Sequence, residues 1–148
     1  MQLVCNITRG KAIESQHIVY AVVINEHNEI LFSTGDPNYV TCIRSSLKPF
    51  QASTLIKYNG HNKFKLSNKE LSLICASHSA EKVHTDTVES ILKKIQCDKN
   101  DLECGVHPAY DLNTRHTMLK EDIPFSNLHN NCSGKHVGML ALANTLEA

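Results

Sequence analysis

The order of apolar patterns along the 148-residue chain constrains its fold more than any other feature, because strand patterns come first and helix patterns follow. Apolar, β-branched residues fill Ile18–Ile24 and Ile30–Thr34, and polar turn-forming residues 25–29 separate them, which predicts a β-hairpin. Gly35-Asp36-Pro37-Asn38 then ends the second strand. Strands grouped before helices indicate an α/β fold of the α+β kind, an antiparallel sheet with helices, rather than a doubly wound sheet.

Helical patterns fill most of the remaining chain. Apolar residues recur at helical spacing from Ser46 to Tyr58, Pro49 fits a first turn and Asn59-Gly60 ends the run, so a helix is expected to begin just after Ser45. Ser67 with Glu70 forms a capping-box pattern ahead of a helix that runs toward Cys75. Further helices are expected over Glu81–Ile95, Asp111–Lys120 and Lys135–Leu146, with loops at Cys104–Pro108 and Asn130–Gly134.

Composition limits the partners of the chain. Lys plus Arg number 15 and Asp plus Glu number 15, so no net field attracts polyanions and nucleic acid is not an expected partner. No apolar run approaches the roughly 20 residues of a membrane helix, so no membrane partner is expected. The first ten residues lack the layout of a secretory leader. We therefore expect a soluble, cytoplasmic chain whose residues 1–148 form a single domain.

Six cysteines are scattered through the strand and helix patterns without the density of a disulfide scaffold, so we expect them to be reduced. Four of them stand beside apolar residues, where free cysteine usually acts as a small buried apolar side chain. These four are Cys5, Cys42, Cys75 and Cys97.

Ser45 and Lys48 form the first candidate catalytic pair. A serine hydroxyl becomes a good nucleophile when a base removes its proton, and a lysine whose pKa is lowered by burial or positive charge can be that base. Residues three apart lie on neighbouring positions of one helix face, and Arg44 beside them could bind a carboxylate through two hydrogen bonds. The spacing alone is weak, because two other pairs share it and a helix cap with a surface lysine is the usual explanation: Ser79 with Lys82, and Ser90 with Lys93.

The segment Ala76–Glu81 is a small, hydroxyl-rich turn between two expected helices. Ser77 follows an apolar run directly, and the ends of strands and helices are where loops present reactive groups. Ser79, by contrast, fits a helix cap before Glu81 equally well. Ser77 is therefore the better candidate for a site hydroxyl.

A third candidate segment, His129–Gly138, concentrates donors, acceptors and small residues before a helix. Backbone N–H groups at a helix start favour a carboxylate or an oxyanion. Cys132, Lys135 and His136 are close enough in sequence to share one metal ion or one substrate. Thiolate and imidazole suit zinc, but lysine is a rare ligand and two or three ligands do not close a tetrahedral site. A polar loop that caps a helix is the plainer alternative.

Seven segments in strict order resemble the landmarks of the type II (rhizobial-type, thermolabile) L-asparaginase family. They are Thr8-Arg9-Gly10, Glu14-Ser15 with His17, Gly35-Asp36-Pro37, Arg44 through Ala52, Ser77-His78-Ser79 with Glu81, Cys104-Gly105 with His107, and Asn130 through Leu140. The resemblance spans essentially the whole chain and implies a family protein roughly double this length, of which this chain would be the amino-terminal half. Ala80 departs from the pattern, since the family usually has glycine there.

The resemblance implies a fold similar to half of a serine β-lactamase or glutaminase, and hydrolysis of L-asparagine to L-aspartate and ammonia by serine-lysine chemistry. It implies a small amino acid as the substrate, and a homodimer or a missing carboxy-terminal half as the protein partner. The implied catalytic residues are Ser45 paired with Lys48, and Ser77, whose own lysine would belong to the other half. The implied substrate-binding residues are Arg44 and His136, and two ligands of a zinc site would be Cys132 and Lys135.

Two alternatives stay open at this point. The chain could be a non-catalytic remnant that keeps the fold and binds a partner or a small amino acid. It could also be a penicillin-recognising serine hydrolase, which would share the pair of Ser45 and Lys48. Spacing does not decide which serine attacks. The amidase interpretation requires the turn carrying Ser45, the turn carrying Ser77 and the bend at Cys132 to converge on one pocket.

Overall fold

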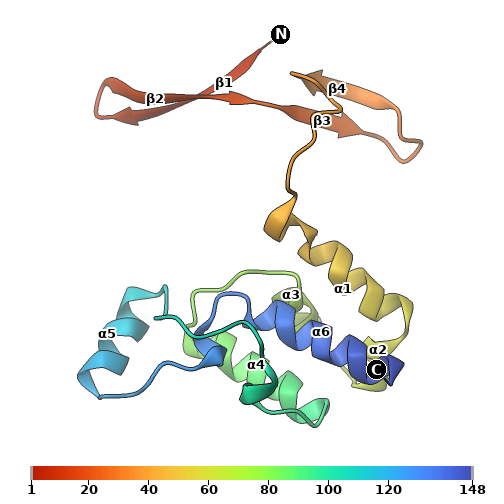
Figure 1. Cartoon of the computed structure of the whole chain (residues 1–148), viewed down its shortest axis with the longest axis vertical. Coiled ribbons are helices and arrows are strands. Elements are labelled where there is room, and N and C mark those ends of the chain that lie inside the picture. The colour runs from red at the N-terminus through yellow and green to blue at the C-terminus, as the bar shows by residue number, and fades with distance from the viewer. Residues whose placement is uncertain (1, 148) are drawn as a thin grey trace. The chain divides into compact units, whose positions relative to one another are not determined.

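The computed structural model describes residues 2–147, and its backbone contacts divide the chain into two compact units, Met1–Cys42 and Ile43–Ala148. The strand unit is the first of these and the helical unit is the second (Figure 1). Among the described residues the fold is a mixed α+β arrangement of two two-stranded antiparallel sheets and six α-helices. The predicted order of strands before helices is therefore confirmed, while the single domain stays a prediction.

The strand unit consists of two hairpins. Strand β1 (Leu3–Arg9) pairs with β2 (Ala12–Val19), and β3 (Ala21–Ile24) pairs with β4 (Ile30–Thr34). The side-chain oxygen of Asn25 accepts hydrogen bonds from the N–H groups of His27 and Glu29 at 2.9 and 3.0 Å, a pattern that stabilises a tight turn. The second hairpin thus confirms the predicted turn and its second strand.

The expectation of one strand over Ile18–Ile24 is wrong, because Tyr20 divides that run between two sheets. Tyr20 stacks on Tyr39 with ring centroids 4.6 Å apart, and its ring fills the place where Gly35 would carry a Cβ, 2.4 Å from Tyr20 Cδ1. Gly35 also has φ +71, a conformation that glycine adopts without strain. A continuous apolar run shows no change of pattern at the residue where the strand partner changes, so the sequence did not predict the break at Tyr20. Strand β1 was not predicted either.

The helical unit contains six α-helices and three short 3₁₀ turns in the described residues. The helices are α1 (Lys48–Lys57), α2 (Gly60–Lys63), α3 (Asn68–Ile74), α4 (Lys82–Lys94), α5 (Leu112–Lys120) and α6 (Ser133–Leu146). The turns span Arg44–Leu47, Lys99–Asp101 and Asn127–His129. All five predicted helices are present. Helix α2 was missed, because Asn59 does end α1 in a left-handed conformation but a new turn begins at Gly60.

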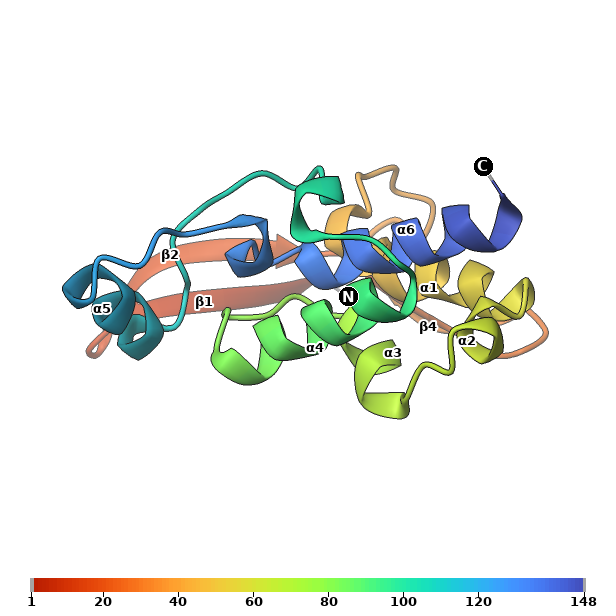
Figure 2. The ribbon, with the colours of Figure 1, turned by 90° about the horizontal axis from the view of Figure 1, so that it is seen from below.

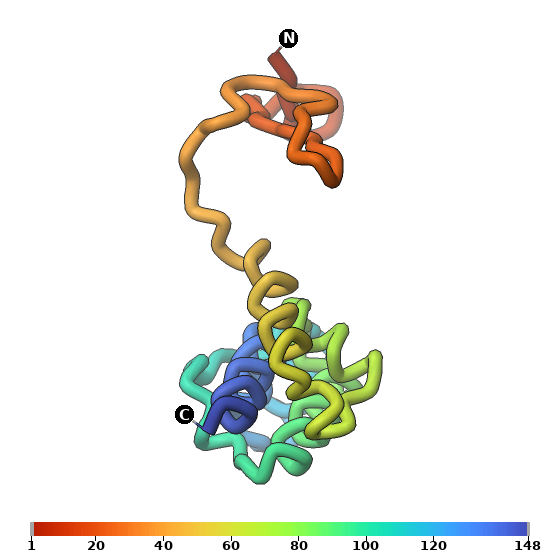
Figure 3. Tube along the Cα trace, turned by 90° about the vertical axis from the view of Figure 1, so that its right-hand side faces the viewer, coloured from red at the N-terminus to blue at the C-terminus, as the bar shows by residue number. Residues whose placement is uncertain are grey.

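Helix α6 is the centre of the helical unit. It packs against α1, α3 and α4, and Figure 2 shows it beside α3 and α4 while Figure 3 shows it alongside α1. The apolar residues that meet there are almost completely buried and include Leu55, Val88, Ile91 and Val137. Helix α6 begins at Ser133, two residues before the predicted start at Lys135, so Ser133 and Gly134 belong to the helix and not to the preceding loop.

The capping box before α3 is confirmed and extends into a buried ionic network. Glu70, 3% exposed, accepts hydrogen bonds from the Ser67 N–H at 2.7 Å, Lys94 Nζ at 2.7 Å and Ser90 Oγ at 2.9 Å. Burial alone would raise the pKa of Glu70, but the hydrogen bonds from Lys94, Ser67 and Ser90 outweigh it and lower the pKa from 4.5 to about 2. The hydroxyl of Ser90 therefore stabilises the Glu70 carboxylate, and the three-residue spacing between Ser90 and Lys93 has no catalytic meaning.

We predict that Glu70→Gln lowers the free energy of unfolding by about 2 to 3 kcal/mol at pH 7, since it removes the charge that Lys94 and two hydroxyls surround. The folded-state pKa is the lower one, so the stabilisation is complete above about pH 4.5 and is lost as the pH falls toward 2. Urea unfolding curves of the two proteins should converge over that range. Asp86→Asn, which breaks the exposed pair with Lys82, is the matched control and should change stability little. A difference that is independent of pH would contradict the prediction.

All six cysteines are free, as expected. Cys75 and Cys97 are half-buried and pack against the core, but Cys5 and Cys42 are exposed, so their predicted burial is wrong. Apolar neighbours in sequence do not bury a strand residue when both faces of a two-stranded hairpin remain open within its unit. Across residues 2–147, no helix combines the length and apolarity that crossing a membrane requires.

Candidate functional site

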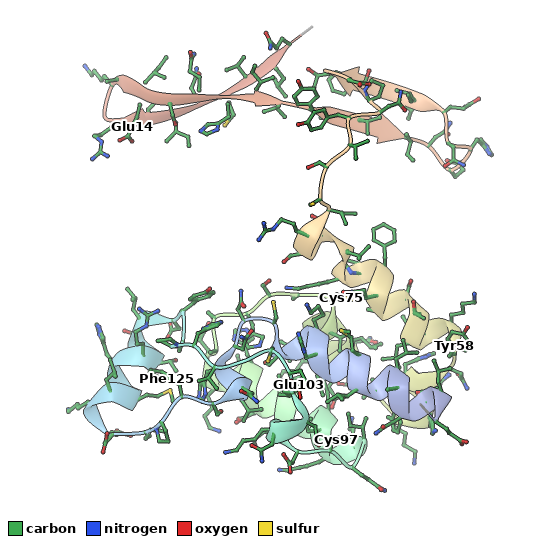
Figure 4. All side chains as sticks on the ribbon, viewed as in Figure 1. Glu14, Tyr58, Cys75, Cys97, Glu103 and Phe125 are labelled. Atoms are coloured by element: carbon green, nitrogen blue, oxygen red, sulfur yellow. The ribbon has the colours of Figure 1, made fainter. Side chains whose placement is uncertain are left out.

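The reactive centre of the helical unit is a contact between Lys48 and Ser77. Lys48 is the first residue of α1, and Ser77 lies in the turn that follows Cys75 at the end of α3 (Figure 4). Lys48 Nζ lies 2.5 Å from Ser77 Oγ in a hydrogen bond. Lys48 is only 3% exposed, whereas Ser77 is exposed to solvent. A buried amine thus reaches a hydroxyl that a substrate can approach, which is the arrangement of a base and its nucleophile.

Ser45, the expected partner of Lys48, lies in the 3₁₀ turn Arg44–Leu47 and is exposed. Its carbonyl oxygen accepts the Lys48 N–H, but no hydrogen bond joins the two side chains in the described part of the chain. The role of Ser45 stays a prediction, and the lysine expected from a missing half is not needed to give Ser77 a partner.

His78 fixes the turn that carries Ser77. It is 6% exposed, its Nε2 lies 2.8 Å from Ser133 Oγ, and its Nδ1 accepts the Ala80 N–H at 3.2 Å. Ser133 Oγ donates its single hydrogen to Leu128 O at 3.0 Å, so it accepts in the bond with His78. The network therefore requires a neutral His78 with its proton on Nε2.

The electrostatic surroundings of His78 agree with that neutral form. Burial, and after it the electrostatic influence of the neighbouring His84, Lys48, His107 and His129 side chains, lowers the pKa of His78 from 6.5 to about 4. A folded-state pKa below the ordinary value means that the network contributes its full stability above about pH 6.5 and loses it as the pH falls toward 4. A protonated ring would turn Nδ1 into a donor facing the Ala80 N–H, which breaks the turn.

Two of the three corners that were expected to converge, the turn with Ser77 and the bend at Cys132, lie next to each other. The His78 N–H donates to Asn131 O at 3.2 Å. Asn130, 7% exposed, donates from Nδ2 to Cys104 O at 2.7 Å and accepts the Cys132 N–H on Oδ1 at 2.8 Å. The buried Asn130 amide therefore holds the bend against the loop that contains Cys104.

Two glycines let α6 approach α3 closely enough to form this junction. A Cβ at Gly134 would lie 2.5 Å from Leu73 O, and a Cβ at Gly138 would lie 2.4 Å from Ile74 Cγ2. Real Cβ contacts are longer than both distances, so a side chain at either position forces movement. The absence of these side chains places the first turn of α6 beside the turn that carries Ser77.

The remaining serine-lysine spacings have ordinary structural roles. Ser79 Oγ donates to Glu81 Oε1 at 2.9 Å, while Lys82 Nζ pairs with Asp86 at 2.7 Å. The N-cap of α4 is Glu81, so Ser79 does not start that helix either.

The expected zinc ligands do not form a closed site in the described residues. Cys132 is the N-cap of α6 and Lys135 lies in its first turn, but no group of three His, Cys, Asp or Glu side chains within residues 2–147 stands close enough to hold a metal ion. A structural zinc takes four ligands, and Cys132 with Lys135 offers two. Burial raises the pKa of the Cys104 thiol, which lies near Cys132 and Lys135. Zinc on Cys132 and Lys135 stays a prediction from the resemblance.

The two residues expected to bind the substrate, Arg44 and His136, make no hydrogen bond to the Lys48–Ser77 pair in the described residues. Arg44 is exposed and has a left-handed φ of 49°. His136 is half-buried, and burial, followed by the charge of Lys135, lowers its pKa below 6.5. Neither side chain hydrogen-bonds to Lys48 or Ser77 in the part of the chain that the structure describes. Their roles in binding a carboxylate stay predictions.

Three hollows border the candidate site, and one of them, about 270 Å³, is lined by Ser77 and His78 together with residues of α3 and α4. The α1/α6 hollow, about 190 Å³, has Lys48 in its wall together with residues of α1, α3 and α6. A wider hollow of about 460 Å³ is lined by Ser77, His78, Ser79, His84, Tyr110 and Asn131. The hydrogen bond between Lys48 and Ser77 therefore joins a residue of the α1/α6 hollow to a residue that lines the other two.

The structure adds site residues that sequence reasoning did not select. His78, Ser133 and Asn130 position the Ser77 turn, yet each looked like part of a polar loop. His78 and Ser133 are 55 positions apart in sequence, so no local spacing could reveal their hydrogen bond. The available signal was the density of hydroxyl, imidazole and amide groups around Ser77 and Cys132.

Comparison with known proteins identified a family model that matches the chain. The family model described as L-asparaginase II matches residues 5–148. A search of curated proteins found no match. The matched range includes Lys48, Ser77 and the complete helical unit up to its last residue.

Proposed function

Since the chain belongs to the L-asparaginase II family, we propose that it provides a serine-lysine site that hydrolyses L-asparagine to L-aspartate and ammonia. The observation that carries this proposal is the 2.5 Å hydrogen bond between Lys48 Nζ and Ser77 Oγ. We assign Ser77 as the nucleophile and Lys48 as its general base. An amide is a substrate that such a pair can cleave, because one lysine can accept the serine proton and return it to the leaving amine.

The proposed reaction needs Lys48 in its neutral form. As Ser77 Oγ attacks the side-chain amide carbon, its proton passes to Lys48 Nζ, and the carbonyl oxygen becomes an oxyanion. Lys48 then protonates the amide nitrogen and the C–N bond breaks. Ammonia is released, and the acyl group remains on Ser77 as an ester. Lys48 next takes a proton from water, the resulting hydroxide attacks the ester, and the proton returns to Ser77 Oγ as L-aspartate departs. Atoms and charge balance over the cycle, and no step involves a metal.

The start of α6 supports the charged intermediates. The hydrogen bond from the His78 N–H to Asn131 O places the Ser77 turn beside the residues that begin α6. A helix start carries partial positive charge, which favours a developing oxyanion or a carboxylate nearby. His78, neutral and locked between Ala80 and Ser133, keeps Ser77 at that position.

The proposal extends the family assignment to fold and partners. We propose that the helical unit is the counterpart of the helical half of a serine β-lactamase or glutaminase, and that a second copy or a carboxy-terminal half completes the site. The non-catalytic remnant remains the second candidate function, because the α1/α6 hollow is a small, mainly apolar pocket with two lysines in its wall, which a small molecule could occupy without any reaction. The penicillin-recognising hydrolase is not favoured, since its defining serine would be Ser45, which has no side-chain bond to Lys48 in the described residues.

Ammonia release from L-asparagine tests the proposal. Release is measured for the chain alone and for the chain mixed with the carboxy-terminal half of a complete family member, with Ser77→Ala and Ser45→Ala as matched variants. We expect Ser77→Ala to abolish release and the acyl-enzyme mass, and Ser45→Ala to keep both. Loss of release with Ser45→Ala but not with Ser77→Ala would overturn the assignment of the nucleophile. No release from either preparation of the unmodified chain would support the non-catalytic remnant instead.

A further inference from the structure

His84 lies in the first turn of α4 and borders both hollows that contain Ser77. It lines the hollow of about 270 Å³ and the hollow of about 460 Å³, as Ser77 and His78 do. Its ring stacks on the ring of His78, with the centroids 5.3 Å apart and an angle of 23° between the planes. His84 is therefore packed against the residue that fixes the Ser77 turn.

The hydrogen bonding of His84 differs from that of its neighbours. Both ring nitrogens of His78 are already in hydrogen bonds, and so is the hydroxyl of Ser79. The side chain of His84 has no hydrogen-bond partner within residues 2–147. Its Nδ1 is buried, whereas its Nε2 is not, so a ligand can reach Nε2.

The burial of Nδ1 decides which nitrogen of the neutral ring carries the hydrogen. An N–H group buried without an acceptor is rarer in proteins than a buried acceptor without a donor. The favoured tautomer therefore has its hydrogen on Nε2 and leaves Nδ1 as an acceptor. In this form His84 presents an uncharged N–H donor at the reachable edge of its ring.

Packing alone does not require an imidazole at position 84. A phenylalanine ring would also stack on His78, and it would place no unpaired polar atom in the interior, where such an atom lowers stability. The property that the imidazole adds is the reachable Nε2–H next to the two hollows of Ser77.

The hollow of about 460 Å³ indicates which acceptor this donor meets. Its walls carry hydroxyl, imidazole, phenol and amide groups, and none of its described lining residues is a carboxylate, an ammonium or a guanidinium. An uncharged donor in such surroundings suits an uncharged acceptor, such as the oxygen of an amide. Lys48 lines a different hollow, so the base and this donor do not compete for one space.

We propose that His84 is a substrate-binding residue whose Nε2–H donates a hydrogen bond to the carbonyl oxygen of the amide that Ser77 attacks. The inference rests on the proposed function for the identity of that amide, the side chain of L-asparagine. The bond strengthens as the carbonyl oxygen becomes an oxyanion, because a charged acceptor makes the stronger hydrogen bond. His84 thus acts in both the bound substrate and the first transition state.

Binding of L-asparagine to the chain carrying Ser77→Ala tests the inference without any turnover. We expect isothermal titration calorimetry to show saturable binding, which the further change His84→Phe weakens by about three- to tenfold, the usual effect of losing one neutral hydrogen bond. His84→Gln keeps an N–H donor and should bind within about twofold of the parent. His84→Phe should also melt no lower than its parent, because it removes a buried, unpaired nitrogen.

His61→Phe is the matched control. His61 also has a buried Nδ1 without a partner in the described residues, but it lies in α2 and lines none of the three hollows around the site. It should leave asparagine binding unchanged. A second readout is the rate at which a serine-reactive fluorophosphonate labels Ser77, since its phosphoryl oxygen takes the place of the amide oxygen. His84→Phe should slow this labelling by about tenfold or more, and His61→Phe should not.

Three outcomes would overturn the inference: no binding of asparagine to the Ser77→Ala chain, unchanged affinity and labelling in a folded His84→Phe variant, or a His84→Phe variant that melts well below its parent. The first would show that no amide is held beside residue 77, the second that Nε2 touches no substrate, and the third that the imidazole acts on the fold. Failure of the proposed nucleophile is separable, because Ser77 would then resist labelling while His84→Phe still weakens asparagine binding.

Discussion

Replacing Lys48 by methionine is expected to lower the rate of ammonia release by about 10²- to 10⁴-fold, the usual contribution of a general base. Methionine keeps most of the length and apolar volume of the lysine side chain, which is 3% exposed, but it cannot accept the proton of Ser77. The fall should appear in kcat, since the amine acts on the reacting hydroxyl. The measurement is steady-state ammonia release by the chain in whichever preparation is active, alone or with a carboxy-terminal half.

Lys57→Met is the matched control for Lys48→Met, because Lys57 is exposed at the other end of the same helix. It should leave kcat unchanged. A second readout covers a chain that is inactive alone: the rate at which a serine-reactive fluorophosphonate labels Ser77, followed by mass spectrometry, should fall with Lys48→Met and rise with pH in the unmodified chain. Equal labelling of Ser77 in the two proteins would rule out Lys48 as its base.

Gly134→Ala is expected to lower the free energy of unfolding by about 2 to 3 kcal/mol, despite the better helix propensity of alanine. Its Cβ would lie 2.5 Å from the carbonyl oxygen of Leu73, a backbone atom of α3 that cannot rotate away. Helices α3 and α6 would have to separate, which moves the Ser77 turn from the start of α6. Urea unfolding gives the stability, and the labelling rate of Ser77 reports the displacement of the turn.

Gly138→Ala is the comparison variant for Gly134→Ala, because its added Cβ would clash with a side chain and not with the backbone. Its Cβ would meet Ile74 Cγ2 at 2.4 Å, and a methyl group can move with its side chain. We expect a smaller loss of stability than for Gly134→Ala and little change in Ser77 labelling. If Gly138→Ala proved the more damaging of the two, close approach to Leu73 would not be what limits the packing of α6.

Local chemistry was sufficient to predict most helices of the described chain. The capping box of Ser67 and Glu70, the amphipathic run of α4 and the Asp111 cap of α5 each involve residues within a few positions of one another. The same reasoning failed at Tyr20, where a run of apolar residues passes from one hairpin to the next, and at Gly60, where a stop signal was followed by another helical turn. Strand partners and helix restarts depend on distant contacts, which a local pattern does not contain.

For the candidate site, too, the sequence predicted the local features and missed the contact that depends on distant residues. Sequence reasoning selected Lys48 and Ser77 from their residue types and positions at the ends of expected elements, and it associated the Ser77 turn with the Cys132 bend. It paired Lys48 with Ser45, because three positions on one helix are easy to recognise, whereas Lys48 and Ser77 are 29 positions apart. Their contact depends on how α1 and α3 pack, and that packing is decided by side-chain volume in the core.

The amino-acid sequence by itself determined the order of strands and helices, the family and the residues able to act as nucleophile and base. These follow from periodicity, capping groups and side-chain chemistry, all of which are present in the linear chain. Only the tertiary structure decided that Lys48 meets Ser77 and that His78 is neutral. Hydrogen-bond direction, burial and the balance of charge depend on which distant atoms become neighbours, and the close packing of α6 on α1 and α3 brings those atoms together.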